Sequence, residues 1–317
     1  MTEKIEKLQS KNLDKDRVSD NYILVTPIKD EEKNLPGLIE SIKNQTVRPS
    51  LWVIVNDGST DNSPVIIRKA AKKMHWIKVI DLNNEKRDIG LRYSYVCKKG
   101  FDYATKYSKE YNISYKYIGL IDGDIIVEKD YFKKLILEFK KDPKLGIGSG
   151  ILYSYSKKGY QLEKTKGNYY GTYPAGACRL WRKECFEDTG GYSLTYAPDT
   201  VSNIKALLRG WKIKRFKHIV AKQVRGTGTA EGLRSYYIKK GIAHYYLYQP
   251  PSVVISRFIK YMLRGNFYGS YYIYGYINAW KNKMKRTTDE EIIKYFKNKS
   301  LLDYIKEELS GDHGEKS

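Results

Sequence analysis

Short apolar runs alternate with amphipathic segments over roughly the first 125 residues, and this alternation constrains the fold more than any other feature. The apolar runs are typical of buried strands and lie at 21–26, 51–55, 77–81 and 117–121. The amphipathic segments are predicted as helices and lie at 35–42, 65–74 and 93–107. Strands that alternate with helices build an open, mostly parallel sheet flanked by helices. The sequence therefore predicts an α/β fold.

The second half of the chain is less regular. Residues 146–155 are predicted as a pair of strands, 198–208 as a helix and 211–216 as an exposed strand. From Ser235 onward the pattern is helical and basic, and it ends in a polar helix at 289–309. We therefore expect a helical C-terminal extension after the sheet.

Composition restricts the class of protein. Of the 317 residues, 41% are hydrophobic, which supports a core, and no apolar run approaches the roughly 18 residues that cross a bilayer. Residues 1–20 are polar and charged, so we expect a loose lead-in and no secretory signal. Cys97, Cys178 and Cys185 are too few and scattered for a disulfide framework or zinc site. Reduced thiols favour a cytosolic protein.

Positive charge is concentrated in the second half. The formal net charge is +22, and residues 201–286 hold 18 Lys or Arg against one acid, Glu231. Such a block attracts polyanions, which include nucleic acid, an anionic membrane surface and phosphorylated substrates. Tyrosines cluster among these basic residues between Ser235 and Trp280. They are consistent with a membrane surface, with the core of a helical subdomain or a homodimer contact, and least with single-stranded nucleic acid.

Two carboxylates interrupt an apolar strand at Asp122-Gly123-Asp124. Buried carboxylates are costly unless a cation or hydrogen bonds compensate them, and oxygen ligands suit Mg²⁺ or Mn²⁺. The alternative is an Asp-Gly turn between two strands. Pro27 and Asp57 also lie just after predicted strand ends. Because ligands collect at the carboxyl ends of strands in such sheets, we expect one pocket at this edge.

Four motifs in order carry a resemblance to a known family. They are Pro27-Ile28-Lys29-Asp30-Glu31-Glu32, Asn56-Asp57-Gly58-Ser59-Thr60-Asp61, Asp122-Gly123-Asp124, and Asp199 eleven residues before Gly210-Trp211-Lys212-Ile213. Over roughly residues 20–225 the chain resembles the family 2 glycosyltransferases of GT-A fold. The resemblance implies a domain at 21–225, with a nucleotide-sugar half at about 21–125 and an acceptor half at about 126–225, followed by a basic, Tyr-rich helical region at 226–317.

The resemblance also implies which residues bind a nucleotide-diphosphate sugar. Pro27, Glu31 and Asp57 correspond to the residues that hold the nucleobase, although Asp57 could instead cap its own turn. Asp122 corresponds to the residue at the ribose or the metal. Asp124 corresponds to the ligand of a divalent cation, Mn²⁺ or Mg²⁺, that bridges the diphosphate.

Asp199 corresponds to the general base of an inverting transfer, in which it takes the proton of the acceptor hydroxyl. Pro198 stands where the family usually has Glu, so a neighbouring carboxylate is missing. The alternative is that Asp199 caps the helix that follows it.

Other positions depart from the family or leave two readings open. Relatives commonly carry a His that completes the metal shell, but residues 221–226 contain no His. In its place Gln223 could orient a metal-bound water. His218, a few residues earlier, is predicted to be structural. Arg87 and Arg92, in the predicted loop after the third strand, suit the donor diphosphate, and a solvated surface is the equal alternative.

The resulting hypothesis is an inverting glycosyltransferase that uses a UDP- or GDP-linked sugar. The Gln-x-x-Arg-Trp signature of processive members is absent, which favours transfer of one sugar per encounter. The acceptor is expected to be a polyprenyl phosphate or a lipid-linked glycan, with the enzyme peripheral on the cytoplasmic face of the membrane. The competing hypothesis is a non-catalytic basic protein that binds nucleic acid or a membrane on the same scaffold.

Overall fold

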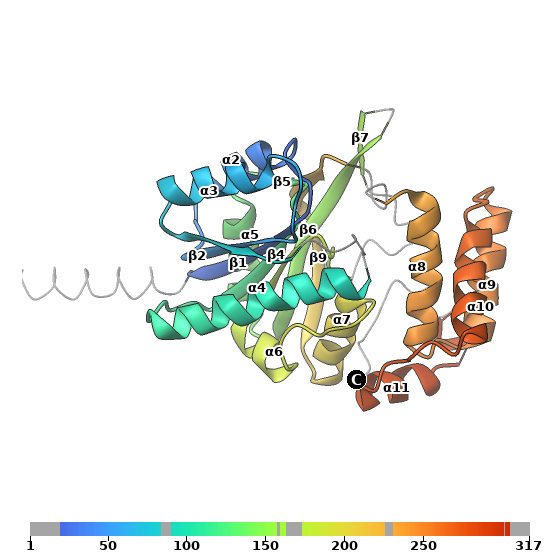
Figure 1. Cartoon of the computed structure of the whole chain (residues 1–317). Coiled ribbons are helices and arrows are strands. Elements are labelled where there is room, and N and C mark those ends of the chain that lie inside the picture. The colour runs from blue at the N-terminus through green and yellow to red at the C-terminus, as the bar shows by residue number, and fades with distance from the viewer. Residues whose placement is uncertain are drawn as a thin grey trace, which may run out of the picture.

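A mixed nine-stranded sheet forms the centre of the molecule (Figure 1). The computed structural model describes residues 20–83, 90–156, 159–162, 173–225, 231–300 and 302–304. The strand order is β3-β2-β1-β4-β8-β6-β9-β5, and β7 pairs with β6 outside this path. The predicted α/β class is confirmed.

The first four strands are parallel and correspond to the four apolar runs. They are β1 (Tyr22–Ile28), β2 (Leu51–Asn56), β3 (Ile77–Asp81) and β4 (Tyr117–Ile121). Since β2 lies on one side of β1 and β4 on the other, the strand order reverses at β1, where open sheets bind ligands. Pro27 is an exception to the prediction, because it pairs in register with Val55 inside β1 and does not follow the strand.

The remaining strands make the second half of the sheet largely antiparallel. They are β5 (Ile125–Val127), β6 (Leu145–Ser156), β7 (Gly159–Leu162), β8 (Cys178–Arg182) and β9 (Lys212–Gln223). The expected strand pair at 146–155 is wrong in detail, since these residues form the single strand β6, whose partner in the hairpin is β7. The strand expected at 211–216 extends to Gln223 because β9 runs parallel to β6 along most of its length.

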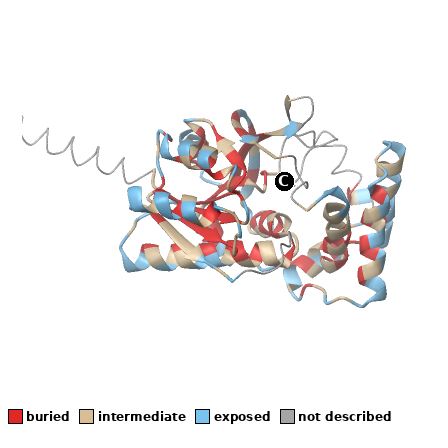
Figure 2. Cartoon of the chain, turned by 45° about the horizontal axis from the view of Figure 1, so that its top comes forward, coloured by how far each residue is buried: buried red, intermediate tan, exposed pale blue. Residues whose placement is uncertain are grey.

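Helices cover both faces of the sheet. On one face lie α2 (Leu35–Lys43), α3 (Ser63–Lys73) and α5 (Tyr131–Lys141), and on the other lie α4 (Leu91–Glu110), α6 (Lys183–Asp188) and α7 (Pro198–Leu208). Along β1, Tyr22 and Leu24 enter the first core and Ile23 and Val25 the second, as the two-residue period of a strand requires. Figure 2 shows the buried residues concentrated along the sheet.

The described part of the C-terminal region contains the helices α8 (Leu233–Tyr246), α9 (Pro251–Leu263), α10 (Gly269–Lys281) and α11 (Glu290–Lys297). Backbones of α8 and α10 touch, since a Cβ added to Gly241 would lie 2.1 Å from the Tyr272 carbonyl oxygen. Tyr245, Tyr272 and Tyr276 are buried in this region, which confirms the helical-core reading for these tyrosines. The helix expected at 289–309 ends at Lys297, and 305–309 lie outside the described residues.

Two further expectations concern the whole chain. Cys97, Cys178 and Cys185 are buried free thiols. Among the described residues, no helix combines the length and the apolar character needed to cross a bilayer. The lead-in expected at residues 1–20 lies, apart from Asp20, outside the described residues.

Candidate active site

The two carboxylates of Asp122-Gly123-Asp124 lie in the turn that joins β4 to β5. The backbone of this turn is fixed on both sides. The Asp122 amide donates to the Ala177 carbonyl at 2.9 Å, and the Val224 amide donates to the Asp124 carbonyl at 2.9 Å. The turn therefore lies between the chain that enters β8 and the chain that leaves β9. Asp124 is 4% exposed, so its carboxylate is largely removed from water.

Burial makes negative charge unfavourable at both aspartates. It raises the pKa of Asp122 to about 8, with a further contribution from the charge of Asp124. Burial also raises the pKa of Asp124, and Arg225 acts in the opposite direction. Tyr93 lies on α4, and its hydroxyl donates a hydrogen bond of 2.7 Å to Asp122 Oδ1. The turn thus concentrates two carboxylates that a cation would stabilise.

Arg225 is a residue of this site that the sequence reasoning did not identify. Its Nη2 donates to Glu31 Oε1 at 2.7 Å and lies 3.4 Å from Asp124 Oδ2. Gln223 Nε2 also donates to Asp124 Oδ2, at 3.2 Å. Gln223 ends β9 and Arg225 follows it, in the segment where the resemblance to the family implies a His. The absence of that His was the available signal that another group takes its place beside Asp124.

The oxygen ligands at this turn are of the kind that a divalent cation requires. Asp122 and Asp124 supply carboxylate oxygens of the kind that Mg²⁺ and Mn²⁺ bind. Within the described ranges, no three His, Cys, Asp or Glu side chains are grouped to hold a metal. The residues therefore fit a cation that takes its other ligands from water and from substrate phosphates, which is usual for Mg²⁺.

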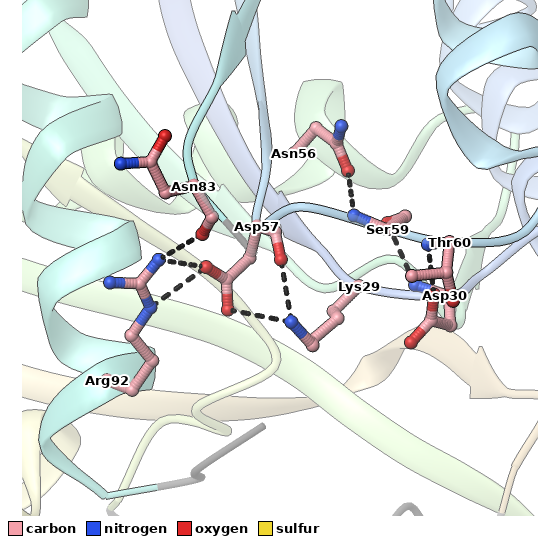
Figure 3. Close-up of polar contacts among 8 residues, drawn as sticks. All are labelled: Lys29, Asp30, Asn56, Asp57, Ser59, Thr60, Asn83 and Arg92. Carbon is pink, nitrogen blue, oxygen red and sulfur yellow. Dashed lines mark hydrogen bonds and ion pairs between the residues drawn. The ribbon is translucent and has the colours of Figure 1, made fainter. Parts of the chain in front are cut away.

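Asp57, directly after β2, is held by two cations (Figure 3). Arg92 donates to Asp57 Oδ1 from Nε at 2.9 Å and also from Nη2. Lys29 Nζ donates to the Asp57 carbonyl at 2.8 Å and lies 3.9 Å from Oδ2. Arg92 was expected in a loop, but α4 begins at Leu91 and places it in the first helical turn. Arg87 lies outside the described residues.

The turn after β2 is fixed by groups other than Asp57. The Ser59 amide donates to Asn56 Oδ1 at 3.0 Å, and the Thr60 amide donates to Asp30 Oδ1 at 2.8 Å. In this structure the carboxylate of Asp57 binds Arg92 and Lys29, as Figure 3 shows, so its side chain is directed away from its own turn. This geometry removes the turn-capping alternative for Asp57.

Asp199 lies in the first turn of α7, and the structure shows no side-chain cap at the start of this helix. Its side chain is 44% exposed and its Oδ2 lies 4.0 Å from Nη2 of the buried Arg179. A Cβ on Gly176 would lie 2.1 Å from Asp199 Oδ2, so the carboxylate sits directly over that glycine. The charge of Asp199 also contributes, after burial and Asp124, to the raised pKa of Asp122. Tyr93, whose hydroxyl binds Asp122, lines the same cavity as Asp199, so the turn after β4 and the start of α7 border one site.

The other predicted residues divide into two groups. Glu31 is 5% exposed and belongs to the site through Arg225, while Pro27 is buried within β1. His218 lies on β9, where its Nε2 is 3.5 Å from Glu138 on α5 and its side chain is 59% exposed. None of the contacts described around Asp124 involves His218, and its structural role stays a prediction.

A cavity of about 390 Å³ opens beside Asp199. Tyr93 and Asp199 line it from the α/β domain, and Lys240, His244 and Arg257 line it from the C-terminal helices. A volume of this size is typical of sites for small molecules. The site at the strand ends therefore continues into a space between the domain and the helical region.

Comparisons with known proteins agree with this architecture. Glycosyltransferase GlyA of Streptococcus pneumoniae is 29% identical over 143 residues, which are 44% of this chain and 18% of that protein. Poly-beta-1,6-N-acetyl-D-glucosamine synthase of Staphylococcus epidermidis is 33% identical over 120 residues, or 38% of this chain and 26% of the synthase. The matched segments are thus about a quarter or less of these curated relatives.

Among solved structures, S. aureus TarS (residues 1–349) has a TM-score of 0.50 at 15% identity, covering 70% of this chain and 64% of that one. This likeness confirms the predicted class of fold. The sequence model described as glycosyl transferase family 2 matches residues 23–196. Because that match spans more than half of the chain, the protein belongs to glycosyl transferase family 2.

Proposed function

We propose that the protein is an inverting glycosyltransferase that moves one sugar per encounter from a nucleotide-diphosphate donor to an acceptor hydroxyl. The observation that carries this proposal is that Tyr93 connects the turn with Asp122 and Asp124 to the cavity that Asp199 lines. The buried carboxylate of Asp124 and the partly buried one of Asp122 suit the cation and diphosphate of a donor. A more exposed carboxylate nearby suits proton transfer from an acceptor. Family membership supports the same chemistry.

The donor is assigned to the edge formed by β1, β2 and β4. Asp57 offers a carboxylate to the nucleobase and is kept in position by Arg92 and Lys29. Asp122 is proposed to bind the ribose or the cation, and Asp124 the cation. When bound, Mn²⁺ or Mg²⁺ would neutralise charge on the diphosphate that leaves. Glu31 belongs to this edge through its contact with Arg225.

The acceptor is assigned to the side of the site that Asp199 faces. The Asp199 carboxylate accepts the proton of the acceptor hydroxyl while the hydroxyl oxygen bonds to the anomeric carbon of the donor sugar. The bond from this carbon to the nucleoside diphosphate breaks on the opposite side, so the configuration inverts. Arg179, which donates to the Pro174 and Ala175 carbonyls, fixes the chain on which Asp199 rests.

A donor panel tests the proposal. UDP- and GDP-sugars are incubated with Mn²⁺ and membrane extract as the acceptor source, and release of the nucleoside diphosphate is measured. We expect Asp199→Asn to lower transfer by about 10²- to 10⁴-fold while donor binding is kept, because a general base contributes on that order. The matched control is Asp102→Asn, which removes an exposed carboxylate paired with Lys98 on α4.

The outcomes separate the alternatives. A mild loss in Asp199→Asn would indicate a phosphate acceptor, which is already anionic and needs no base. Full activity of Asp124→Asn would contradict the metal role of Asp124. If no donor stabilises the protein or is turned over, and RNA binds in a salt-sensitive manner, the non-catalytic basic binding protein is the better description.

A lipid-linked acceptor at a membrane surface is the finer part of the proposal, and the outer face of α9 supports it. Ile255, Ile259 and Leu263 are four residues apart and 51%, 49% and 84% exposed. They form an apolar stripe on a basic region, which suits peripheral binding to anionic lipid on the cytoplasmic face. Phe267 and Trp280 are also exposed nearby in the sequence, at 76% and 61%.

Vesicle flotation tests the membrane contact. Leu263→Glu should lower binding to phosphatidylglycerol vesicles, and Leu137→Glu should not, since Leu137 is an exposed leucine on α5. Equal flotation of the two variants would contradict membrane binding through α9. A dimer in sedimentation that Leu263→Glu dissociates would show that a second copy covers this face.

A further inference from the structure

We propose that the cavity beside Asp199 binds a phosphate group of the acceptor, which Lys240 and Arg257 recognise while an acceptor hydroxyl faces Asp199. This inference rests on the proposed function and adds to it the chemical class of the acceptor. The phosphate is a recognition group here and keeps all of its bonds during the transfer.

Charge in the cavity is strongly one-sided. Its lining includes four cations against one carboxylate, Asp199, and these cations are Lys239, Lys240, Arg257 and Lys299. Lys239 forms an ion pair with Glu231. The hydrogen bonds of Lys240 and Arg257 in the described part of the chain are to neutral groups. Lys240 donates to the Tyr261 hydroxyl at 2.9 Å, and Arg257 donates to His244 Nε2 at 3.0 Å.

Among the described residues no carboxylate forms an ion pair with Lys240 or Arg257, and neutral partners hold both cations in place. His244 Nε2 must accept from the guanidinium, so its Nδ1 carries the proton and donates to the Tyr272 hydroxyl at 2.7 Å. Lys240 also lies 5.6 Å from the centre of the Tyr261 ring. Partly buried cations fixed by neutral groups are favourable for an anion that arrives from solvent. A guanidinium and an ammonium are the groups that bind phosphate best.

The rest of the lining suits a sugar. Tyr93 and Tyr196 contribute from the α/β domain, and Tyr236 and Tyr295 from the helices. Tyrosine combines an apolar ring face with a polar hydroxyl, as a sugar ring requires of its neighbours. Since Asp199 lines the same cavity, a ligand held there lies beside the proposed base. The cavity therefore fits a glycan or lipid acceptor that bears a phosphate, and not a remote regulatory ligand.

Phosphate binding can be measured without any donor, so its result is independent of the proposed transferase activity. The probes are inorganic phosphate, glucose 6-phosphate and dodecyl phosphate, each at matched ionic strength, and the readout is the shift in Tm. We expect wild type to be stabilised and the double variant Lys240→Gln/Arg257→Gln to bind at least about tenfold more weakly. A larger Tm shift with dodecyl phosphate would indicate that the phosphate belongs to a lipid acceptor. A larger Tm shift with glucose 6-phosphate would indicate that it belongs to a glycan acceptor.

The matched control is Lys69→Gln/Lys72→Gln, which removes the same charge from exposed positions on α3. This control should show the same Tm shift as wild type. Arg257→Lys retains the positive charge and should show most of that Tm shift. If the double variant does not fold, Lys299→Gln at the same cavity should weaken phosphate binding by itself. Equal shifts in wild type, double variant and control, or no shift of wild type with any probe, would overturn the proposal.

Acceptor kinetics provide a second test of the cavity. With a donor that wild type uses, the double variant should raise the KM for acceptor in membrane extract, and Lys69→Gln/Lys72→Gln should leave that KM unchanged. A wild type that turns over no donor but binds phosphate through Lys240 and Arg257 contradicts the transferase function alone. A double variant with unchanged KM and unchanged phosphate binding contradicts the cavity assignment alone.

Discussion

At the scale of single residues, Arg225 decides the charge balance of the site. One guanidinium contacts both Glu31 and Asp124, each about 5% exposed, so it holds two buried carboxylates together. A divalent cation at Asp124 would compete for the same oxygen. Arg225 therefore has a role before the donor and its cation arrive, which is to make the empty site stable.

We predict that Arg225→Ala destabilises the protein in EDTA and that Mn²⁺ restores part of the loss. Removing one partner of a buried ion pair costs about 3–5 kcal/mol, and the 30% exposure of Arg225 places the expected value at the lower end. Thermal unfolding with and without Mn²⁺ measures both effects. The control is Arg68→Ala, whose ion pair with Asp81 is at the surface and is worth at most about 1 kcal/mol. A loss no larger than in this control would show that Arg225 does not stabilise the site.

At the scale of elements, α8, α9 and α10 meet at a buried histidine. His244 on α8 contacts Arg257 on α9 and Tyr272 on α10. Burial, followed by the charges of Arg257 and Lys240, holds the pKa of His244 well below its usual value near 6.5. The imidazole is therefore neutral in the folded protein at pH values where the unfolded chain is protonated.

This difference makes stability depend on pH. Below about pH 6.5 the unfolded state binds a proton at His244 that the folded state does not bind. The contribution is complete above that pH and decreases as pH falls, by up to about 1.4 kcal/mol per pH unit. We predict that His244→Gln flattens the fall in stability between pH 6.5 and 5.5, measured by urea unfolding. The exposed His218→Gln is the control and should follow wild type. A curve for His244→Gln parallel to wild type would rule out this linkage.

At the scale of the whole molecule, a shared core joins the C-terminal helices to the α/β domain. Val201 and Ile204 of α7 pack with Ile292 and Phe296 of α11. Ion pairs reinforce the contact, since Lys205 Nζ lies 2.5 Å from Asp289 and Arg209 donates to both carboxylate oxygens of Glu291. Because α7 also carries Asp199, this joint positions the cavity between the two parts.

We predict that Phe296→Ala, at 2% exposure, lowers the free energy of unfolding by about 3–5 kcal/mol and raises the KM for acceptor more than that for donor. The physical reason is that removal of the Phe296 ring leaves a cavity between α11 and α7, which lets α11 and its neighbours shift relative to Asp199. Urea unfolding and the donor assay measure the two effects. Phe267→Ala, at 76% exposure, is the matched control, with an expected change within about 0.5 kcal/mol. Equal losses in the two variants would show that the joint does not hold the helices in place.

Most of the parallel half of the sheet was predictable because β1, β2 and β4 are buried on both faces and are therefore continuous apolar runs. The run at 117–121 matches β4 to the residue, and 77–81 matches the edge strand β3, of which only Ile77 is buried. The prediction failed where pairing partners lie far apart in the chain. The strand β9 is alternating and partly exposed, and only its pairing with β6 extends it to Gln223. A start at Leu91 for α4 was likewise missed, and with it the contact of Arg92 with Asp57.

The sequence by itself determined the α/β class, the place of Asp57, Asp122 and Asp124 after strands, and Asp199 at the start of a helix, because local periodicity and turn chemistry are written in adjacent residues. Only the tertiary structure decided what compensates those charges. Arg225 reaches Glu31 across 194 positions of sequence. The tertiary structure also brings Arg257 and Asp199 to one cavity, because α9 and α11 pack with α7 in one core. Such contacts depend on how elements that are distant in sequence pack together, and no local pattern of residues encodes that packing.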